Sequence, residues 1–269
     1  MGQILTALLS VLRWVRHAIL GNRHQAQMAI NQYFDGQKEN LRRSLNWEPF
    51  AEIFPLVDKL YVDAIGLMPT DRSPVFGQFL LICHKSFLSA AALIGQAQPD
   101  DAGPITRRAI EVARFAAIIK TNPEKVEEWV AFSERARRWA DRQEGKKPKS
   151  LRVNLGEVHP GVEPTIDELM GMYGILSDAD VHFTPEFFHQ LDWDKREESL
   201  YLNYFTRDQR VLEREIVLTS GTHLRILEVI DWCLDGAFKS NPDWLRLVGT
   251  LKEKGAPLTE KFEHPDAQG

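Results

Sequence analysis

Two opposite charges lie one helical turn apart in a segment that is otherwise strongly apolar. Residues 104–120 carry Arg107 and Glu111 among alanine, isoleucine, valine and phenylalanine. Side chains four residues apart on a helix share one face and can meet. Burying a charge is costly unless it is paired, so the pattern predicts a specific role for this pair. Two arrangements stay open: an ion pair inside a bundle, or a polar surface stripe shared with Arg108 and Arg114.

A histidine follows the predicted end of another helix. His182 comes after Ser177 and two aspartates, with apolar neighbours on both sides. Histidine titrates near neutral pH and can act as an acid, a base or a ligand. A histidine near a helix end can also be a hydrogen-bonded structural residue, and the sequence leaves both roles open.

The stretch 135–152 is strongly basic. It holds eight basic residues against two acidic ones, a local charge of +6, and it includes Trp139. Basic side chains interleaved with an aromatic ring are typical of surfaces that bind a phosphate backbone, which makes RNA a possible partner for this stretch. A solvated helix face that runs into a loop explains the same composition. The overall charge of -5 gives no global attraction to nucleic acid, so any such contact must be local.

The pair Arg152 and His159, separated by six residues, is similar to the arginine–histidine pair of HEPN ribonucleases. That resemblance implies that the histidine helps to move the proton of an attacking 2′-hydroxyl while the arginine steadies the phosphate. The pair lies in a loop-like segment, 144–163, that is rich in glycine and proline.

The middle of the chain, about 75–185, resembles a bacterial all-helical family known only as a domain of unknown function. Four short motifs carry the resemblance: the apolar helix from Phe76 to Leu88, the Arg-x-x-x-Glu of Arg107 and Glu111, the stretch from Lys120 to Trp129, and Tyr173-x-x-Leu-Ser177 followed by Val181-His182. The resemblance implies one polar site inside a helical bundle, and it implies roles in phage defence or stress.

From these patterns we predict a candidate site. Its catalytic residues would be His182 as general base or acid, Arg107 as phosphate ligand and Glu111 as orienting group. The predicted substrate-binding residues are Arg108, Ser177, Arg138, Lys146 and Lys147. No metal and no cofactor is predicted, because phosphate-loop, dinucleotide-binding and zinc-ligand motifs are missing from the sequence.

Helical periodicity dominates the elements that must position these residues. The sequence predicts an all-α fold, a multi-helix bundle of about ten helices with no significant β-sheet. The expected helices cover 3–20, 23–45, 49–67, 74–97, 103–120, 123–143, 164–177, 194–219, 222–238 and 242–253. Serine or asparagine followed by proline marks three of the starts, at Ser73, Asn122 and Asn241.

At 269 residues, the chain is long enough for a large core. We expect N-terminal helices (1–70) packed on a central bundle (73–190), C-terminal helices of the same globule (194–254) and a flexible tail (255–269). The cysteines, Cys83 and Cys233, lie in apolar helical contexts, which is typical of buried thiols in a reducing cytoplasm.

The segment 3–20 has the spacing of an amphipathic helix. Two arginines interrupt it, so it is too short and too polar for a membrane span. We expect it to pack on the core or on a partner helix, with binding to a membrane surface as the alternative. Two functions follow as hypotheses. The first is a cytoplasmic interaction module that acts through this N-terminal amphipathic helix and its helical surfaces, and that forms a homo-oligomer or binds a protein partner. The alternative is a HEPN-like, metal-independent ribonuclease or phosphodiesterase that uses Arg107, Glu111 and His182.

Overall fold

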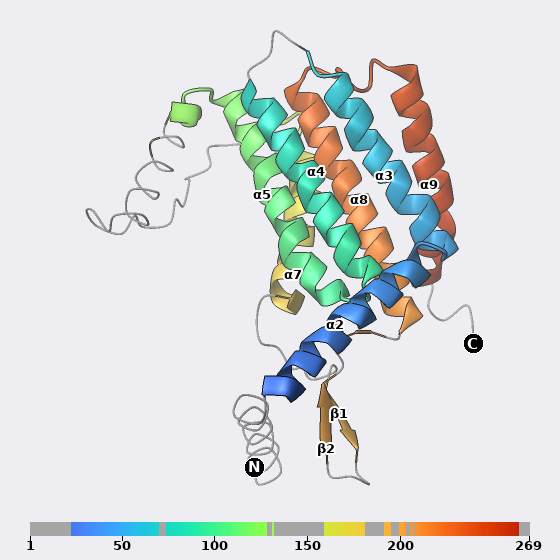
Figure 1. The fold of residues 1–269 in the computed structure, drawn as a ribbon. Helices are drawn as coiled ribbons and strands as arrows, with labels where there is room; N and C mark the ends of the chain where they lie inside the picture. Colours follow the sequence, from blue (N-terminus) through green and yellow to red (C-terminus); the bar gives the residue numbers. More distant parts are fainter. Residues whose placement is uncertain are drawn as a thin grey trace.

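Long helices standing side by side make up the structure, a computed structural model (Figure 1). It describes residues 23–69, 74–127, 131, 159–180, 191–194, 199–202, 205–206 and 208–263. The elements in chain order are α2 (Arg23–Ser44), α3 (Glu48–Gly66), α4 (Pro74–Gly95), the 3-10 helix η1 (Pro99–Asp101), α5 (Ala102–Thr121), α7 (Glu163–Asp180), β1 (Leu191–Asp194), β2 (Ser199–Leu202), α8 (Gln209–Cys233) and α9 (Pro242–Glu263).

The prediction of an all-α fold is confirmed, but the expected number of about ten helices is not. The described ranges contain seven α-helices and one 3-10 helix. The expected helix 3–20 and most of the expected helix 123–143 lie outside the described residues.

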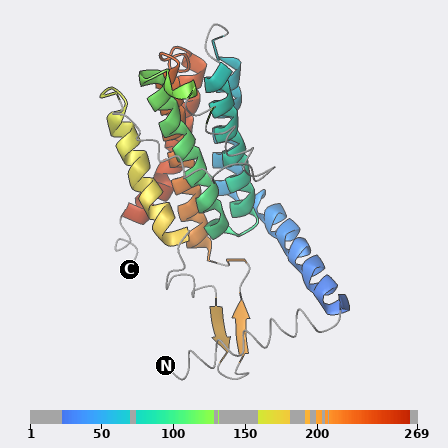
Figure 2. The ribbon, with the colours of Figure 1, turned by 90° about the vertical axis from the view of Figure 1, so that its left-hand side faces the viewer.

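Helix α8 is the centre of the bundle. It packs against α3, α4 and α5, while α7 and α9 lie on the flanks and α2 crosses one end (Figures 1 and 2). Burying apolar side chains of α3, α4, α5, α7, α8 and α9 in one core is the main favourable contribution to folding. The largest fully buried side chains include Trp244, Tyr61, Phe79, Phe87, Phe238 and Leu169, which come from several helices and the α8–α9 connection.

The expectation of two helices, at 194–219 and 222–238, is wrong. A single helix, α8, runs from Gln209 to Cys233 straight through Gly221. Asp208 caps its start, because its carboxylate accepts a hydrogen bond from the backbone N–H of Arg210 at 2.9 Å. A mid-helix glycine costs about 1 kcal/mol relative to alanine, which burial of α8 on several sides outweighs.

The residues before α8 also differ from the prediction. Where a helix from 194 was expected, β1 and β2 form an antiparallel ribbon in which Leu191 lies opposite Leu202 and Asp194 opposite Ser199. Each strand has four residues, so the ribbon is a small exception to the all-α architecture.

The expectation of a flexible tail from residue 255 is also wrong for residues 255–263, because α9 continues to Glu263. Leu258 packs against the core, and the Lys261 ammonium pairs with the buried Glu213 of α8. Pro257 lies inside the helix, as Pro55 lies inside α3. Both prolines are exposed, so water can solvate the backbone carbonyl that each proline leaves without an N–H donor.

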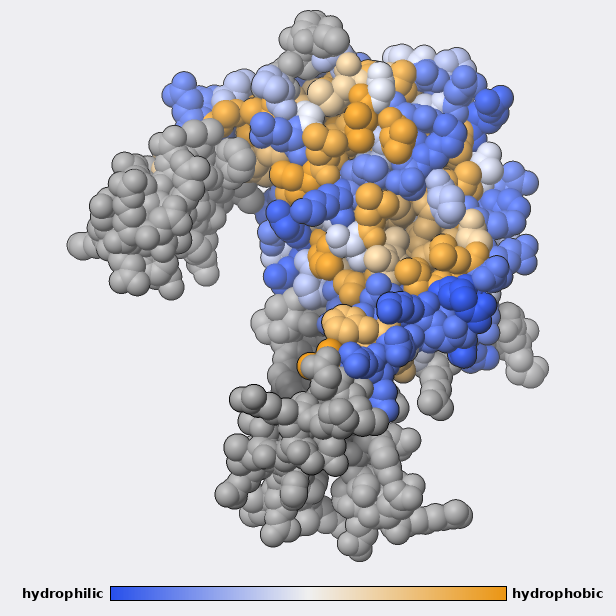
Figure 3. All heavy atoms as spheres, in the orientation of Figure 1, coloured by the Kyte–Doolittle hydropathy of each residue, from blue (hydrophilic) through white to orange (hydrophobic). Residues whose placement is uncertain are grey.

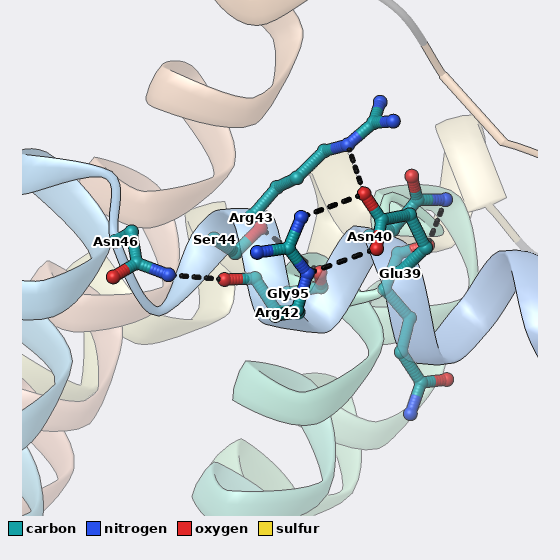
Figure 4. Close-up of polar contacts among 8 residues, drawn as sticks. Glu39, Asn40, Arg42, Arg43, Ser44, Asn46 and Gly95 are labelled. Carbon is teal, nitrogen blue, oxygen red and sulfur yellow. Dashed lines mark hydrogen bonds and ion pairs between the residues drawn. The ribbon is translucent and has the colours of Figure 1, made fainter.

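The C-terminal end of α4 is capped by side chains of α2 (Figure 4). Ser44 Oγ donates to the Gly95 carbonyl at 2.9 Å, and Asn40 Nδ2 donates to the Gln96 carbonyl at 3.3 Å. These bonds satisfy carbonyls that a helix end leaves without an internal partner. On the outer side of α2, hydrogen bonds from Arg42 and Arg43 lower the pKa of Glu39 to about 2.

The close approach of α2 and α3 to this end of α4 requires a glycine at position 95. A Cβ there would lie 2.8 Å from Phe50 Cζ and 2.9 Å from Leu41 Cδ1. We expect Gly95→Ala to lower the free energy of unfolding by about 1–3 kcal/mol, because the buried Phe50 ring must move. Gly221→Ala is the matched control: no atom lies within 4 Å of its added Cβ, so this variant should be as stable as the wild type or more stable. Urea denaturation measures both, and an unchanged Gly95→Ala midpoint would contradict the packing.

Candidate functional site

The predicted residues Arg107 and Glu111 share a neighbour on α7. The Tyr173 hydroxyl donates to Glu111 Oε1 at 3.0 Å, and the Arg107 guanidinium carbon lies 5.3 Å from the centre of the Tyr173 ring. A hydrogen bond or a cation–π contact at a solvated site contributes only modestly to the stability of the fold. Tyr173 therefore joins the two charged side chains of α5 to α7.

The expectation of an ion pair shielded inside the bundle is wrong. Glu111 and Arg108 are exposed, and Arg107 is half-buried. The alternative of a polar stripe along the outer side of α5 describes these residues better. The helix is still mostly apolar because its other side packs against α4 and α8.

Most other residues of the predicted site lie outside the described residues. This holds for His182, Arg138, Lys146 and Lys147, and for the rest of the basic stretch 135–152. Ser177 is on the last turn of α7, but its side chain is not among those described. The meeting of His182 with Arg107 and Glu111 therefore stays a prediction.

Sequence reasoning missed a line of four polar and ionisable side chains between α3, α4 and α8. His84 Nε2 and Asp58 Oδ1 are 2.7 Å apart, and the Tyr61 hydroxyl lies 2.8 Å from His223 Nδ1. The Tyr61 and His84 rings stack with their centres 5.1 Å apart. Asp58 and Tyr61 are one turn apart on α3, but the sequence carries no signal that pairs them with histidines on two other helices.

The inner half of this line is removed from water. Tyr61 and His223 are fully buried. Burial, with a smaller contribution from nearby His84, lowers the pKa of His223 to about 3, and burial raises the pKa of Tyr61 well above its ordinary value. Both side chains are therefore neutral at pH 7, which is the state in which polar groups are least costly to bury.

The geometry does not give these four residues access to a substrate. Of the two grooves described next, neither is lined by any of them. Within the described ranges His223 Nε2 has no hydrogen-bond partner, and the Cys83 thiol, whose pKa burial raises, contacts the Ala109 carbonyl at 3.7 Å. The arrangement fits a structural bond that fixes α3 against α8 better than acid–base catalysis.

Two grooves lie on the surface of the bundle. One, of about 530 Å³, separates α3 from α9 and has Val62, Leu67 and Trp244 among its lining residues. The other, of about 490 Å³, lies where α5 and α8 end and includes His159, Trp232 and Lys120.

His159, the histidine of the HEPN-like spacing, has local structural contacts in the second groove. Its Nδ1 accepts a hydrogen bond from the backbone N–H of Gly161 at 3.0 Å, and its ring centre is 5.6 Å from that of Trp232. Arg152, its predicted partner, lies outside the described residues.

Two further features bear on the class of protein. Among the residues that the structure describes, no group of three or more histidine, cysteine, aspartate or glutamate side chains could hold a metal ion. Helix α4 is long and apolar enough to cross a membrane by length and composition. Because α4 packs against α3, α5 and α8, core packing explains its composition equally well.

Fold and contacts together define a helical-bundle protein. Comparison with known proteins adds no relative: no family model, no curated protein and no solved structure matches the chain.

The buried His223 makes a prediction about acid stability. Because its pKa falls from 6.5 to about 3 on folding, the unfolded chain binds a proton below pH 6.5 that the folded chain does not. The contribution of the neutral His223 to the free energy of unfolding is therefore complete above pH 6.5. It is lost as the pH falls toward 3, by at most about 1.4 kcal/mol per pH unit.

We expect His223→Gln to flatten the decrease in unfolding free energy between pH 7 and pH 5, measured by urea denaturation. Tyr61→Phe is the control, because it removes the hydrogen bond but leaves the histidine buried, so the decrease should persist. Equal pH dependence in His223→Gln and the wild type would show that His223 is not the titrating group.

Proposed function

We propose that the protein is a cytoplasmic, non-catalytic interaction module that binds a protein partner through the outer face of α3 and α4. The observation that carries the proposal is a set of large apolar side chains exposed on two neighbouring helices. Val62 and Leu81 are 53% and 54% exposed, and Leu88 is 47% exposed. In Figure 3, apolar (orange) atoms gather on the side of the bundle where α3 and α4 face the viewer.

The exposed residues follow the spacing of a helix-packing seam. On α4 the exposed positions Gln78, Leu81, Lys85 and Leu88 alternate in steps of three and four residues. On α3 the same steps join the exposed Pro55, Val62 and Ile65 and the half-buried Asp58. Steps of three and four keep side chains on one stripe that another helix can cover. We call the stripe formed by Pro55, Asp58, Val62, Ile65, Leu81, Lys85 and Leu88 the α3/α4 face.

Exposing such a stripe to water is unfavourable unless a partner covers it. Burial of a leucine or valine side chain contributes about 1.5–3 kcal/mol. Contiguous apolar surface with polar residues among it is typical of contact sites between proteins. The two free, buried cysteines agree with a reducing compartment and support a cytoplasmic setting.

A second candidate, the HEPN-like ribonuclease, is favoured by one observation. The contacts of Tyr173 with Arg107 and Glu111 gather a cation, a phenol and a carboxylate at a partly exposed position. The resemblance suggests His182 as its acid or base, and phage defence or stress as its setting. The interaction module remains the better supported proposal, because Val62, Leu81 and Leu88 are each about half exposed on two neighbouring helices.

The first test of the interaction module is site-specific photo-cross-linking in cells. We expect a photoreactive benzoylphenylalanine at position 81 of the full chain to give a covalent adduct with one reproducible polypeptide, identified by mass spectrometry of the linked peptides. The same residue at position 175 is the control, since Ile175 is 59% exposed but lies on α7. Adding Leu88→Glu should reduce the adduct at position 81 at least tenfold. If positions 81 and 175 gave the same pattern, the α3/α4 face would not be a docking site.

The second test addresses catalysis. If the chain is an interaction module, purified protein without added metal should cleave single-stranded RNA no faster than His182→Ala, Arg107→Ala and Glu111→Ala. Cleavage that each of these substitutions reduces at least 100-fold, in proteins with wild-type circular dichroism, would contradict the proposal and support the ribonuclease. Arg246→Ala, on the exposed side of α9, is the control for loss of an arginine.

A further inference from the structure

Resting on the proposed function, we propose that the partner on the α3/α4 face is a second copy of this chain, related by a two-fold axis parallel to α3 and α4. Three properties of the face carry the inference: the register between the two helices, the order of apolar residues and the placement of opposite charges. Each property makes the face complementary to itself.

The register follows from the contact between Asp58 and His84. Their atoms lie 2.7 Å apart, so these two residues are level on α3 and α4. The two helices run in opposite directions (Figure 1). Residues that follow Asp58 on α3 are therefore level with residues that precede His84 on α4, so Val62 is level with Leu81. In the other direction, Pro55 precedes Asp58 and is level with Leu88, which follows His84.

A two-fold axis parallel to the helices preserves these levels. It places α3 of each copy across from α4 of the other, with the facing helices antiparallel. Val62 of one copy then meets Leu81 of the other, and Pro55 meets Leu88. Apolar side chains thus face apolar side chains, as in the seam of an antiparallel four-helix bundle.

The charges on the face obey the same symmetry. Lys85 is exposed and, among the described residues, makes no ion pair. It is next to His84 in the chain, so the two-fold axis brings it to the level of Asp58 on the other copy. The Asp58 side chain is 44% exposed although one of its oxygens contacts His84. Two equivalent contacts between Lys85 and Asp58 therefore flank the axis, which electrostatic complementarity between partners requires.

In this dimer the Asp58–His84 pair positions the carboxylate that faces Lys85 of the second copy. His84 is 15% exposed and stacked on Tyr61, which itself is fixed to α8, so the imidazole is held in one position. The imidazole in turn holds the Asp58 carboxylate between the two helices. A carboxylate held in place loses less side-chain entropy when a lysine of the second copy binds it.

The first experiment measures the mass of the full chain in solution by light scattering after size exclusion, over a range of concentrations. We expect twice the chain mass for the wild type. Leu81→Glu combined with Leu88→Glu should raise the dimer dissociation constant at least ~100-fold, because each substitution acts twice in a symmetric interface. Ile175→Glu, an equally exposed position on α7, should leave the mass unchanged. A wild type that is monomeric at all concentrations overturns the proposal, and so does a double variant that remains dimeric.

Single charge changes keep the test independent of folding, because Lys85 is exposed. Lys85→Glu should raise the dissociation constant about tenfold by facing Asp58, and Asp58→Asn should restore part of the loss while keeping an oxygen for His84. Lys252→Glu on α9 is the matched control and should have no effect. Equal effects of Lys85→Glu and Lys252→Glu would contradict the charge pairing.

The second experiment tests the register. Chains with Val62→Cys are mixed with chains carrying Leu81→Cys under mild oxidation, and the mixture should form a disulfide-linked dimer. Mixing Val62→Cys with Leu88→Cys should give at least tenfold less, because the two positions lie at different levels. A reversed preference would exclude the proposed axis.

The outcomes separate this inference from the proposed function. If the adduct at position 81 contains a different polypeptide while the wild type is monomeric, the interaction module stands and the second copy is excluded. If no adduct and no dimer form, both fail.

Discussion

Burial of α8 between α3, α4 and α5 is the constraint on which the rest of the structure depends. The helix buries residues on several sides, including Ile216, Ile226, Leu227 and Ile230. This packing keeps the helix continuous through Gly221, and it places His223 where only the neutral imidazole is tolerated. Because α3 and α4 both rest on α8, they stand side by side with their outer surfaces on the same side of the bundle.

Local sequence signals located the helix starts better than the helix ends. Asn241 caps α9 as expected: its side-chain oxygen accepts from the backbone N–H groups of Asp243 and Trp244 at 2.9 and 3.2 Å. The continuation of α9 past residue 254 was not predictable, because it depends on contacts of Leu258 and Lys261 with distant parts of the chain. The same is true of α8, in which tertiary burial outweighs the preference of Gly221 for a break.

In the candidate site, too, local sequence signals predicted only part of what the structure shows. Spacing alone predicted that Arg107 and Glu111 share a helix face, and both side chains contact Tyr173. Spacing could not predict their exposure, because exposure depends on how much of α5 is covered by α7. The pairs Asp58–His84 and Tyr61–His223 join residues 26 and 162 positions apart in the chain. No local pattern links such residues, so only the packing of three helices reveals them.

The distribution of reactive and apolar side chains is the basis for proposing an interaction module rather than an enzyme. Catalysis needs an ionisable group near its working pKa in reach of a substrate. Among the described residues, Tyr61, His223 and the thiols of Cys83 and Cys233 have strongly shifted pKa values and are buried, whereas leucine and valine side chains are exposed on α3 and α4. The buried Tyr61–His223 bond fixes α3 on α8, and through the stacked His84 ring it also fixes the register of α3 against α4. The buried polar side chains therefore affect the surface indirectly, because they hold the exposed apolar residues of α3 and α4 in the alignment on which the proposed partner depends.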